Sequence, residues 1–247
     1  MTTRVALVTG GIGGIGTSIC QRLAKDGYKV VASYHPAEQD KVESWVAARM
    51  TEGLDVGTVA GDVSSAEDSA RMVAAIQQQF GPVDVIVNCA GITRDKTFRK
   101  MDADSWGAVI NVNLNSVYNV TKPCWDGMID RGFGRVINVS SVNGQRGQFG
   151  QTNYSAAKAG MHGFTMALAQ EGAAKGVTVN TISPGYIETA MTAAIREDVL
   201  KVIIDSVPMK RMGKPEEIAA TVAFLASDEA AYITGANIQI NGGLFMH

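Results

Sequence analysis

The stretch Thr9-Gly-Gly-Ile-Gly-Gly-Ile-Gly16 stands between a β-branched run, Val5–Val8, and an amphipathic segment, Ile15–Lys25. Glycine is needed where a backbone turns tightly and approaches a pyrophosphate closely, and the N–H groups at the start of the following helix face that anion. A flexible turn would also contain glycines, but the strand before the loop and the helix after it favour dinucleotide binding. The glycines fit Gly11-x-Gly13-x-x-Gly16 or Gly10-x-x-x-Gly14-x-Gly16, and the candidate cofactor contacts are Gly10, Gly13, Gly14, Ile15 and Gly16.

Outward from this loop, short β-branched runs alternate with longer segments of helical periodicity, which is typical of βαβ units around a parallel sheet. The strand candidates are Val5–Val8, Lys29–Ser33, Val56–Ala60, Val83–Asn88, Arg135–Val139, Val177–Ile182 and Asn237–Ile240. The amphipathic segments include Ile15–Lys25, Glu67–Phe80, Trp106–Met128, Tyr154–Lys175 and Pro215–Ala226. We therefore expect an α/β Rossmann fold, a doubly wound sheet of seven parallel strands with helices on both faces. Because no linker-like stretch divides the chain, residues 1–247 are expected to form a single domain.

The composition narrows the classes of function. The formal net charge is −2 and the pI is about 5.9, without a local cluster of basic residues, so nucleic acid is not an expected partner. The longest apolar runs are shorter than the roughly 20 residues of a membrane span, and the N-terminus lacks a signal-peptide pattern, so a cytoplasmic protein without membrane contact is expected. Cys20, Cys89 and Cys124 are odd in number and lack metal-ligand spacing, so neither a metal site nor a disulfide framework is expected.

The end of the second predicted strand should discriminate NAD from NADP. An acidic side chain there would bind the ribose 2′-hydroxyl and repel a 2′-phosphate, but the stretch reads Ser33-Tyr34-His35 without an acid. Those three residues are the candidate 2′-phosphate contacts, with Lys41 nearby. Glu38 lies at the spacing of an NAD-type acid and no arginine is present, but we interpret Glu38 as a solvated residue that opens the next helix. The expected cofactor is NADP(H).

Further motifs follow in order along the chain. They are Asn88-Cys-Ala-Gly91, Asn113, Ser140-Ser141, Tyr154-Ser-Ala-Ala-Lys158 and Pro184-Gly185. Together with the glycine loop, this set resembles the short-chain dehydrogenase/reductase family along essentially the whole chain. A Tyr-x-x-x-Lys pair alone is common, whereas six motifs at the family's spacing are specific.

The resemblance implies roles for these residues. Tyr154 would be the general acid, Lys158 its activator, Ser141 the hydroxyl that orients the carbonyl, and Asn113 the anchor of a proton-relay water. Singly, each has an ordinary structural interpretation, such as a packed aromatic, a solvated amine, a turn residue or a buried amide. The remaining cofactor contacts that the resemblance implies, beside Tyr154 and Lys158, are Gly61, Asp62, Val63, Asn88, Ala90, Gly91, Pro184, Gly185, Ile187 and Thr189.

The chemistry of ketone reduction requires these residue types. Hydride goes from a nicotinamide to carbon while the oxygen gains a proton, so a proton donor must stand at the oxygen. Free tyrosine has a pKa of about 10, and we expect a neighbouring cation to lower the pKa of Tyr154. Tyr154 and Lys158 are four residues apart and share one face of a helix, while Ser141 would donate to the developing alkoxide.

Two stretches narrow the resemblance within the family. Asn143-Gly-Gln-Arg-Gly-Gln-Phe-Gly-Gln-Thr-Asn-Tyr154 and Ser183-Pro-Gly-Tyr-Ile look like the acetoacetyl-CoA reductases of polyhydroxybutyrate synthesis, which are relatives of the 3-oxoacyl-acyl-carrier-protein reductases. Ile92-Thr-Arg-Asp95 and Asn241-Gly-Gly fit the same group. The resemblance implies NADPH-dependent reduction of acetoacetyl-CoA to (R)-3-hydroxybutanoyl-CoA by a homotetramer.

An insertion of about residues 186–214 follows the sixth predicted strand, at the end of the sheet where open α/β sheets bind ligands, and is the candidate substrate lid. The segment between Ser141 and Tyr154 should border the reacting carbonyl, although it also has the composition of an ordinary loop. Arg196 is either a contact to a coenzyme A phosphate or a solvated ion-pair partner. The candidate substrate contacts are Asp95, Ser141, Gln148, Phe149, Gln151, Tyr154, Gly185, Tyr186 and Arg196.

Two alternative functions remain open at this point. A 3-oxoacyl-acyl-carrier-protein reductase would need a basic docking surface, which Arg131, Arg135 and Lys175 could supply. A nucleotide-binding regulator without catalysis is the alternative from another class, because a fold does not fix a function. The intact catalytic set argues against the regulator; it comprises Ser141, Tyr154, Lys158 and Asn113.

Overall fold

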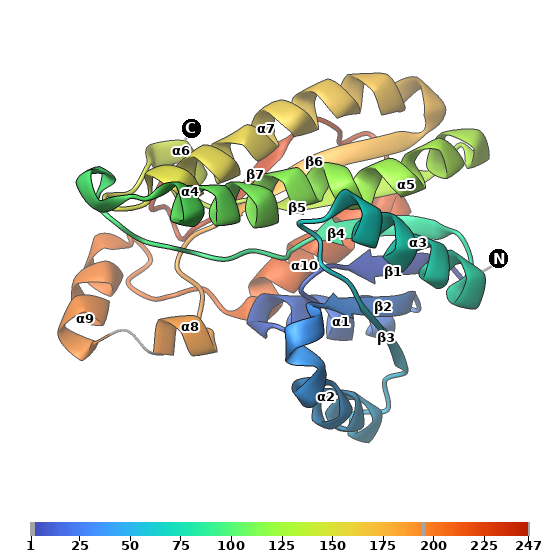
Figure 1. Ribbon diagram of the computed structural model, residues 1–247, viewed down its shortest axis with the longest axis horizontal. Coiled ribbons are helices and arrows are strands. Elements are labelled where there is room, and N and C mark those ends of the chain that lie inside the picture. Colours follow the sequence, from blue (N-terminus) through green and yellow to red (C-terminus); the bar gives the residue numbers. More distant parts are fainter. Residues whose placement is uncertain (1–2, 194–195, 247) are drawn as a thin grey trace.

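The centre of the protein is a seven-stranded sheet, seen in a computed structural model that describes residues 3–193 and 196–246 (Figure 1). The order is β3-β2-β1-β4-β5-β6-β7 and every pairing is parallel. The strands are β1 (Val5–Val8), β2 (Lys29–Tyr34), β3 (Val56–Ala60), β4 (Val83–Asn88), β5 (Gly134–Val139), β6 (Val177–Pro184) and β7 (Asn237–Ile240). The predicted parallel, doubly wound sheet is confirmed.

The strand order reverses between β1 and β4. From β1 the chain builds outward to β3, then returns to the other side of β1 and continues outward to β7. In open α/β sheets, ligands bind beyond the carboxyl ends of the strands at such a switch point. Thr9 follows β1 there, and its Oγ1 accepts hydrogen bonds from the N–H groups of Cys89 and Ala90, at 3.0 and 3.1 Å. The ends of β1 and β4 are thereby held together.

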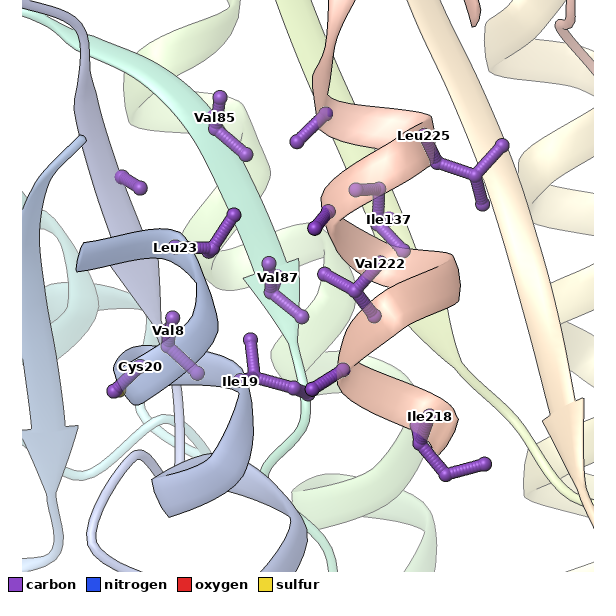
Figure 2. Packing of buried hydrophobic residues seen from close by; sticks show 14 of the residues in the cluster. Val8, Ile19, Cys20, Leu23, Val85, Val87, Ile137, Ile218, Val222 and Leu225 are labelled. Carbon is purple, nitrogen blue, oxygen red and sulfur yellow. The ribbon is translucent and has the colours of Figure 1, made fainter. Parts of the chain in front are cut away.

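Helices cover both faces of the sheet (Figure 1). One face carries α1 (Gly14–Lys25), α2 (Gln39–Thr51) and α10 (Pro215–Ala226), and the other carries α3 (Ala66–Phe80), α5 (Ser116–Arg131) and α7 (Thr152–Gly172). Figure 2 shows the first face, where Ile19 and Leu23 of α1 and Val222 of α10 meet Val8 and Val87 of the sheet. Each buried aliphatic side chain of this kind contributes about 1.5–3 kcal/mol to folding.

The shorter helices lie mainly in the connections between these elements. They are α4 (Ala103–Ile110), α6 (Asn143–Arg146), α8 (Ala190–Ala193) and α9 (Glu197–Ser206), with 3₁₀ turns at Pro36–Glu38, Phe98–Lys100, Ala173–Lys175 and Asp228–Ala230. The predicted helix Trp106–Met128 is in fact α4 and α5 joined by a π-helical turn, η3 (Asn111–Asn115). Its start is earlier than predicted because the Asp102 side chain caps α4, accepting from the Ser105 N–H at 2.7 Å.

Backbone hydrogen bonds join the two ends of the insertion that follows β6. The Gly213 N–H donates to the Tyr186 carbonyl and the Glu188 N–H donates to the Gly213 carbonyl, both at 2.9 Å. Between these bonds, α8 and α9 stand away from the sheet (Figure 1), and α9 has no buried residue. The predicted lid segment is therefore a distinct excursion from the fold, and its role as a lid stays a prediction. Within the described residues, no helix combines the length and apolar character needed to span a membrane.

Candidate active site

The glycine loop makes a close backbone turn between β1 and α1. Gly10 adopts a φ of 61°, which favours glycine. A Cβ on Gly16 would collide with the Gly10 carbonyl and lie 2.9 Å from the Gly11 Cα, so this position excludes any side chain. Gly13 and Gly14 are exposed, and Ile15 packs partly into the core. The loop therefore presents bare backbone at the start of α1, as a pyrophosphate site requires.

The phenol, hydroxyl and amine of the predicted catalytic set lie together at the carboxyl ends of the strands. Ser141 follows β5, and its hydroxyl lies close enough to the phenol of Tyr154, in the first turn of α7, to oppose the rise in the pKa of that phenol. Lys158 is one turn further along α7, with Nζ 5.6 Å from the centroid of the Tyr154 ring. The Asn143 N–H donates to Ser141 Oγ at 3.1 Å, which leaves the Ser141 hydroxyl hydrogen free to donate.

Asn113 completes this cluster from the π-helical turn. Its side chain is buried, and Nδ2 donates to the carbonyls of Ile92 and Val109, both at 2.9 Å. Its Oδ1 is buried and has no hydrogen-bond partner within the described part of the chain. A Cβ added to Gly91 would lie 2.6 Å from this Oδ1 and 3.6 Å from Lys158 Nζ. Because residue 91 is a glycine, the position beside it is free of a side chain. The Asn113 Oδ1 acceptor and the Lys158 amine border this position.

Burial shifts both ionisable groups away from their charged forms. It raises the pKa of Tyr154 to about 12, although the hydrogen bond with Ser141 acts in the opposite direction. Burial also lowers the pKa of Lys158 to about 8, which Cys89 partly opposes. The expected lowering of the Tyr154 pKa by its neighbouring amine is thus wrong for this structure, because desolvation of the phenol outweighs the other contributions. At neutral pH the phenol holds its proton and the amine is still mostly charged.

The residues of the predicted 2′-phosphate site differ in accessibility. Tyr34 is buried and its hydroxyl donates to Gln39 Oε1 at 2.7 Å, so it is committed within the protein. Ser33 is buried, and its Oγ has no partner within the described residues. His35 is exposed, and its Nδ1 accepts from the Ala37 N–H. Of the three, only His35 presents a ring to solvent.

Glu38 lies in the 3₁₀ turn that precedes α2. Its carboxylate pairs with Lys41 at 3.1 Å. This placement agrees with the interpretation of Glu38 as a solvated residue at the start of a helix, and the pairing compensates its charge. The stretch therefore holds no uncompensated carboxylate at the end of β2.

The other predicted cofactor contacts fall into two groups. Near the crevice, a Cβ on Gly10 would meet the Ala90 Cα at 3.0 Å, and a Cβ on Gly14 would meet the Thr189 Cγ2 at 3.1 Å. Asn88 and Ile187 instead direct buried side chains into the protein, Asn88 to Asn138 Oδ1 at 2.8 Å and Ile187 into the core. These two residues could therefore contact a nucleotide only through their backbone groups. The remaining positions are Gly61, Asp62 and Val63 after β3, Pro184 at the end of β6, and Gly185 next to Asn241.

Asp62 and Val63 are also engaged within the protein. Asp62 Oδ1 accepts from both the N–H and the hydroxyl of Ser64, at 2.9 and 2.7 Å. The buried Val63 accepts at its carbonyl from Asn119 Nδ2 at 3.0 Å. These bonds fix the course of the backbone after β3, where the adenine contact was predicted.

Among the predicted substrate contacts, Asp95 and Gln151 bind each other. Gln151 Nε2 donates to Asp95 Oδ2 at 2.8 Å, and Gln151 Oε1 accepts from Asn143 Nδ2 at 3.0 Å. Both ends of the Gln151 amide are therefore used inside the protein. Phe149 is 87% exposed, and Gln148 accepts from the Arg146 side chain at 3.3 Å.

The predicted contacts in the insertion are placed differently. Tyr186 is half-buried at the base of the insertion, next to Gly185. Arg196 is exposed and makes a two-pronged ion pair with Asp198, with bonds of 3.1 and 2.6 Å. Of the two interpretations of Arg196, the structure agrees with the solvated ion-pair partner.

These features fit a bound dinucleotide. The loop that ends at Gly16 leaves no room for side chains where a pyrophosphate would approach, and it opens onto the start of α1. Two buried oxygens near the crevice, Ser33 Oγ and Asn113 Oδ1, have no partner within the described residues. Such orphaned polar atoms in a native structure usually have a missing partner, such as a ligand or ordered water.

Comparison with known proteins agrees with this geometry. A family model described as Enoyl-(Acyl carrier protein) reductase matches residues 10–245. An acetoacetyl-CoA reductase of Allochromatium vinosum is 70% identical over 244 residues, 99% of each chain. The chain belongs to the short-chain dehydrogenase/reductase family. An acetoacetyl-CoA reductase of Cupriavidus necator is 56% identical over the whole of both chains, and a 3-oxoacyl-acyl-carrier-protein reductase of Pseudomonas aeruginosa is 45% identical over 98% of both.

One residue of the basic surface predicted for this short-chain dehydrogenase/reductase is wrong. Arg135 is buried, and its guanidinium donates to the backbone carbonyls of Gly134, Gly176 and Ser227. It cannot contribute to the exposed basic patch that carrier-protein docking was expected to use, whereas the other two residues of that patch, Arg131 and Lys175, are exposed. Gly134 and Gly176 precede or begin β5 and β6, so this part of the molecule lies at the opposite end of the strands from Tyr154.

Sequence reasoning missed several groups that hold the catalytic cluster in place. Lys158 Nζ donates to the carbonyl of Val139, the last residue of β5, at 2.7 Å. Asn153 is completely buried directly before Tyr154. A backbone carbonyl as an acceptor has no signal in the sequence, and an asparagine in the first turn of a helix is common. Neither the Lys158 hydrogen bond nor the burial of Asn153 was therefore predictable from the pattern of residues.

Proposed function

We propose that the protein reduces acetoacetyl-CoA to (R)-3-hydroxybutanoyl-CoA with NADPH. The observation that carries this proposal is the convergence of the Tyr154 phenol, the Ser141 hydroxyl and the Lys158 amine where the glycine loop meets the carboxyl ends of the strands. This arrangement supplies a proton donor and an alkoxide-stabilising donor beside a dinucleotide crevice. The substrate class follows from relatives named acetoacetyl-CoA reductase at 70% and 56% identity.

The protein's residues handle the proton in this reaction. When bound, the nicotinamide supplies hydride to the ketone carbon. The phenol of Tyr154, which burial keeps protonated, gives its proton to the ketone oxygen, and Ser141 donates a hydrogen bond to the same oxygen. The charged amine of Lys158 then stabilises the resulting phenolate from one helical turn away.

Asn113 and Lys158 return a proton to Tyr154. Lys158 Nζ carries three hydrogens and uses one on the Val139 carbonyl, so two remain for other partners. The unpartnered Asn113 Oδ1 faces the same space beside Gly91. A water held between these groups connects the amine to solvent and lets the phenolate regain its proton after each turnover.

The preference for NADPH rests on the end of β2. An acid there would repel a 2′-phosphate. Glu38 is paired with Lys41, and His35, directly after β2, is exposed and available to a phosphate. Ser33 adds a buried hydroxyl without a partner among the described residues.

The substrate segments, the lid role of residues 186–214, a homotetramer and a cytoplasmic location belong to the same proposal. Phe149, which is exposed, and Tyr186, which is half-buried, are the candidate contacts to the acyl thioester, whereas Gln151 and Asp95 bind each other. The exposed Phe149 is suited to cover an apolar acyl or pantetheine group.

Reduction of 3-oxoacyl groups on a carrier protein is the second candidate. It is supported by the relative at 45% identity that is named for that activity. The burial of Arg135 removes one of the three residues of the docking surface that this candidate was expected to use, whereas Arg131 and Lys175 are exposed.

The test is a spectrophotometric assay of NADPH and NADH oxidation with acetoacetyl-CoA and with acetoacetyl-carrier protein. We expect NADPH oxidation with the CoA substrate to have the highest kcat/KM. A higher kcat/KM with the carrier-protein substrate would favour the second candidate. Consumption of neither cofactor would favour a non-catalytic nucleotide-binding regulator.

A further inference from the structure

Asn153 is a buried polar residue that directly precedes Tyr154. Its side chain has no exposed surface, and both of its polar atoms bind backbone groups, with Met101 Sδ as a further acceptor of Nδ2 at 3.5 Å. Nδ2 donates to the carbonyls of Arg94 and Ser105, both at 3.2 Å, and Oδ1 accepts from the Tyr154 N–H at 2.8 Å. One side chain therefore joins the segment after β4, helix α4 and the start of α7.

The bond to Tyr154 replaces a missing helix cap. The first N–H groups of a helix have no intrahelical partner, and α7 begins without a side-chain cap from its N-cap residue, Gln151. Tyr154 is the third residue of α7, so its N–H is one of these orphan donors. Asn153 satisfies this donor from within the helix and ties it to two other segments.

Neighbouring contacts reinforce the same junction. The Lys96 N–H donates to the Gly150 carbonyl at 2.9 Å, next to the Gln151–Asp95 hydrogen bond. Residues 94–96 thus run beside residues 150–153 with three separate connections. Of these connections, only the one through Asn153 is made by a completely buried side chain that also binds the backbone of the tyrosine itself.

We propose that Asn153 is a positioning residue that fixes the place of the Tyr154 hydroxyl in the reaction. This inference rests on the proposed role of Tyr154 as the proton donor. A general acid must stand within hydrogen-bond reach of the oxygen that it protonates, and a displacement of about 1 Å can cost roughly a hundredfold in rate. Asn153 touches no reacting atom and acts only through the backbone from which the phenol projects.

Asn180 provides a matched control. It is also buried, its Nδ2 donates to the Ile233 carbonyl at 2.8 Å, and its Oδ1 accepts from the Ala236 N–H at 3.1 Å. It lies within β6 and joins backbone segments, as Asn153 does, but it does not adjoin a catalytic candidate. Asn153→Leu and Asn180→Leu should therefore unpair similar groups and lower the melting temperature alike.

The decisive experiment measures Asn153→Leu in two backgrounds, wild type and Tyr154→Phe, by acetoacetyl-CoA turnover and NADPH affinity. We expect Asn153→Leu to lower kcat about tenfold or more in the wild type, with NADPH affinity changed less than about threefold. In the Tyr154→Phe background it should cost less than about twofold, because a residue that acts through the phenol has nothing left to position. Asn180→Leu should leave kcat within about threefold of the wild type.

Several results would overturn the inference. They are equal losses in the two backgrounds, a loss in Asn180→Leu as large as in Asn153→Leu, or a loss explained by weaker NADPH binding. Should Asn153→Leu not fold, Asn153→Asp replaces it, since it keeps the acceptor for the Tyr154 N–H and removes the two donors. Normal wild-type turnover with equal losses overturns the inference alone, whereas absent wild-type turnover overturns the proposed function and the inference together.

Discussion

Lys158 Nζ donates a hydrogen bond of 2.7 Å to the backbone carbonyl of Val139, at the end of the strand that leads to Ser141. The amine of Lys158 is thus bound to the last residue of β5, two positions before Ser141. Its position does not depend on a carboxylate partner, so burial is free to lower its pKa to about 8. The charge of Lys158 is therefore sensitive to pH within an accessible range.

The first prediction concerns the alkaline limb of the pH–rate profile. The pKa of Lys158 is lowered from 10.5 to about 8, so the amine is charged below that pH and loses its charge above it. Reduction needs the charged amine, so kcat/KM should fall above about pH 8. In Lys158→Arg, whose guanidinium stays charged, the limb should move upward by about one pH unit or more. An unchanged limb in this variant would assign the titration to another group.

The second prediction concerns Tyr154→Phe. This change removes the phenol oxygen beside Ser141 and leaves the ring in place. Loss of a general acid should lower kcat by about 10² to 10⁴, while the melting temperature and NADPH affinity stay near those of the wild type. Steady-state kinetics, thermal unfolding and NADPH fluorescence titration measure the three quantities. Near-normal turnover would remove Tyr154 from the mechanism.

The fold and the catalytic cluster were predictable because their signals are local. The alternation of β-branched runs with amphipathic segments fixed the strands, and β5 and β6 differ from the prediction only by one or two residues at an end. Tyr154 and Lys158 lie on one helical face at a spacing of four residues, which requires no knowledge of the tertiary structure.

Features that depend on neighbours distant in the sequence were not predictable. Arg135 occupies a strand that is buried on both faces, and its guanidinium reaches carbonyls as far along the chain as Ser227. The pKa of Tyr154 depends on how completely the surrounding segments exclude water, which no motif encodes. The π-helical turn at Asn113 inserts an irregularity into a helix whose apolar periodicity continues on either side.

The third prediction concerns the space beside Gly91. A Cβ there would lie 2.6 Å from Asn113 Oδ1 and 3.6 Å from Lys158 Nζ, where the relay water is proposed. Gly91→Ala should therefore lower kcat by about tenfold or more by blocking proton return. Gly163→Ala, on α7, is the control, because a Cβ at Gly163 would meet no atom within 4 Å among the described residues outside its own stretch of helix. A Gly91→Ala enzyme as fast as the control would show that this space is not used in turnover.

The last prediction concerns the hydrogen bond between Gln151 and Asp95. Gln151→Glu would place a second carboxylate opposite Asp95, at a contact that is now 2.8 Å. Like charges at this distance repel, so the segment before α7 should shift and kcat should fall by roughly tenfold. Adding Asp95→Asn provides an amide donor opposite the new carboxylate and should restore most of the loss, because the two residues interact with each other. If Gln151 instead contacts the acyl substrate directly, Gln151→Glu raises KM for acetoacetyl-CoA and Asp95→Asn does not restore it. Comparison of kcat and KM among the two single variants, the double variant and the wild type distinguishes these outcomes.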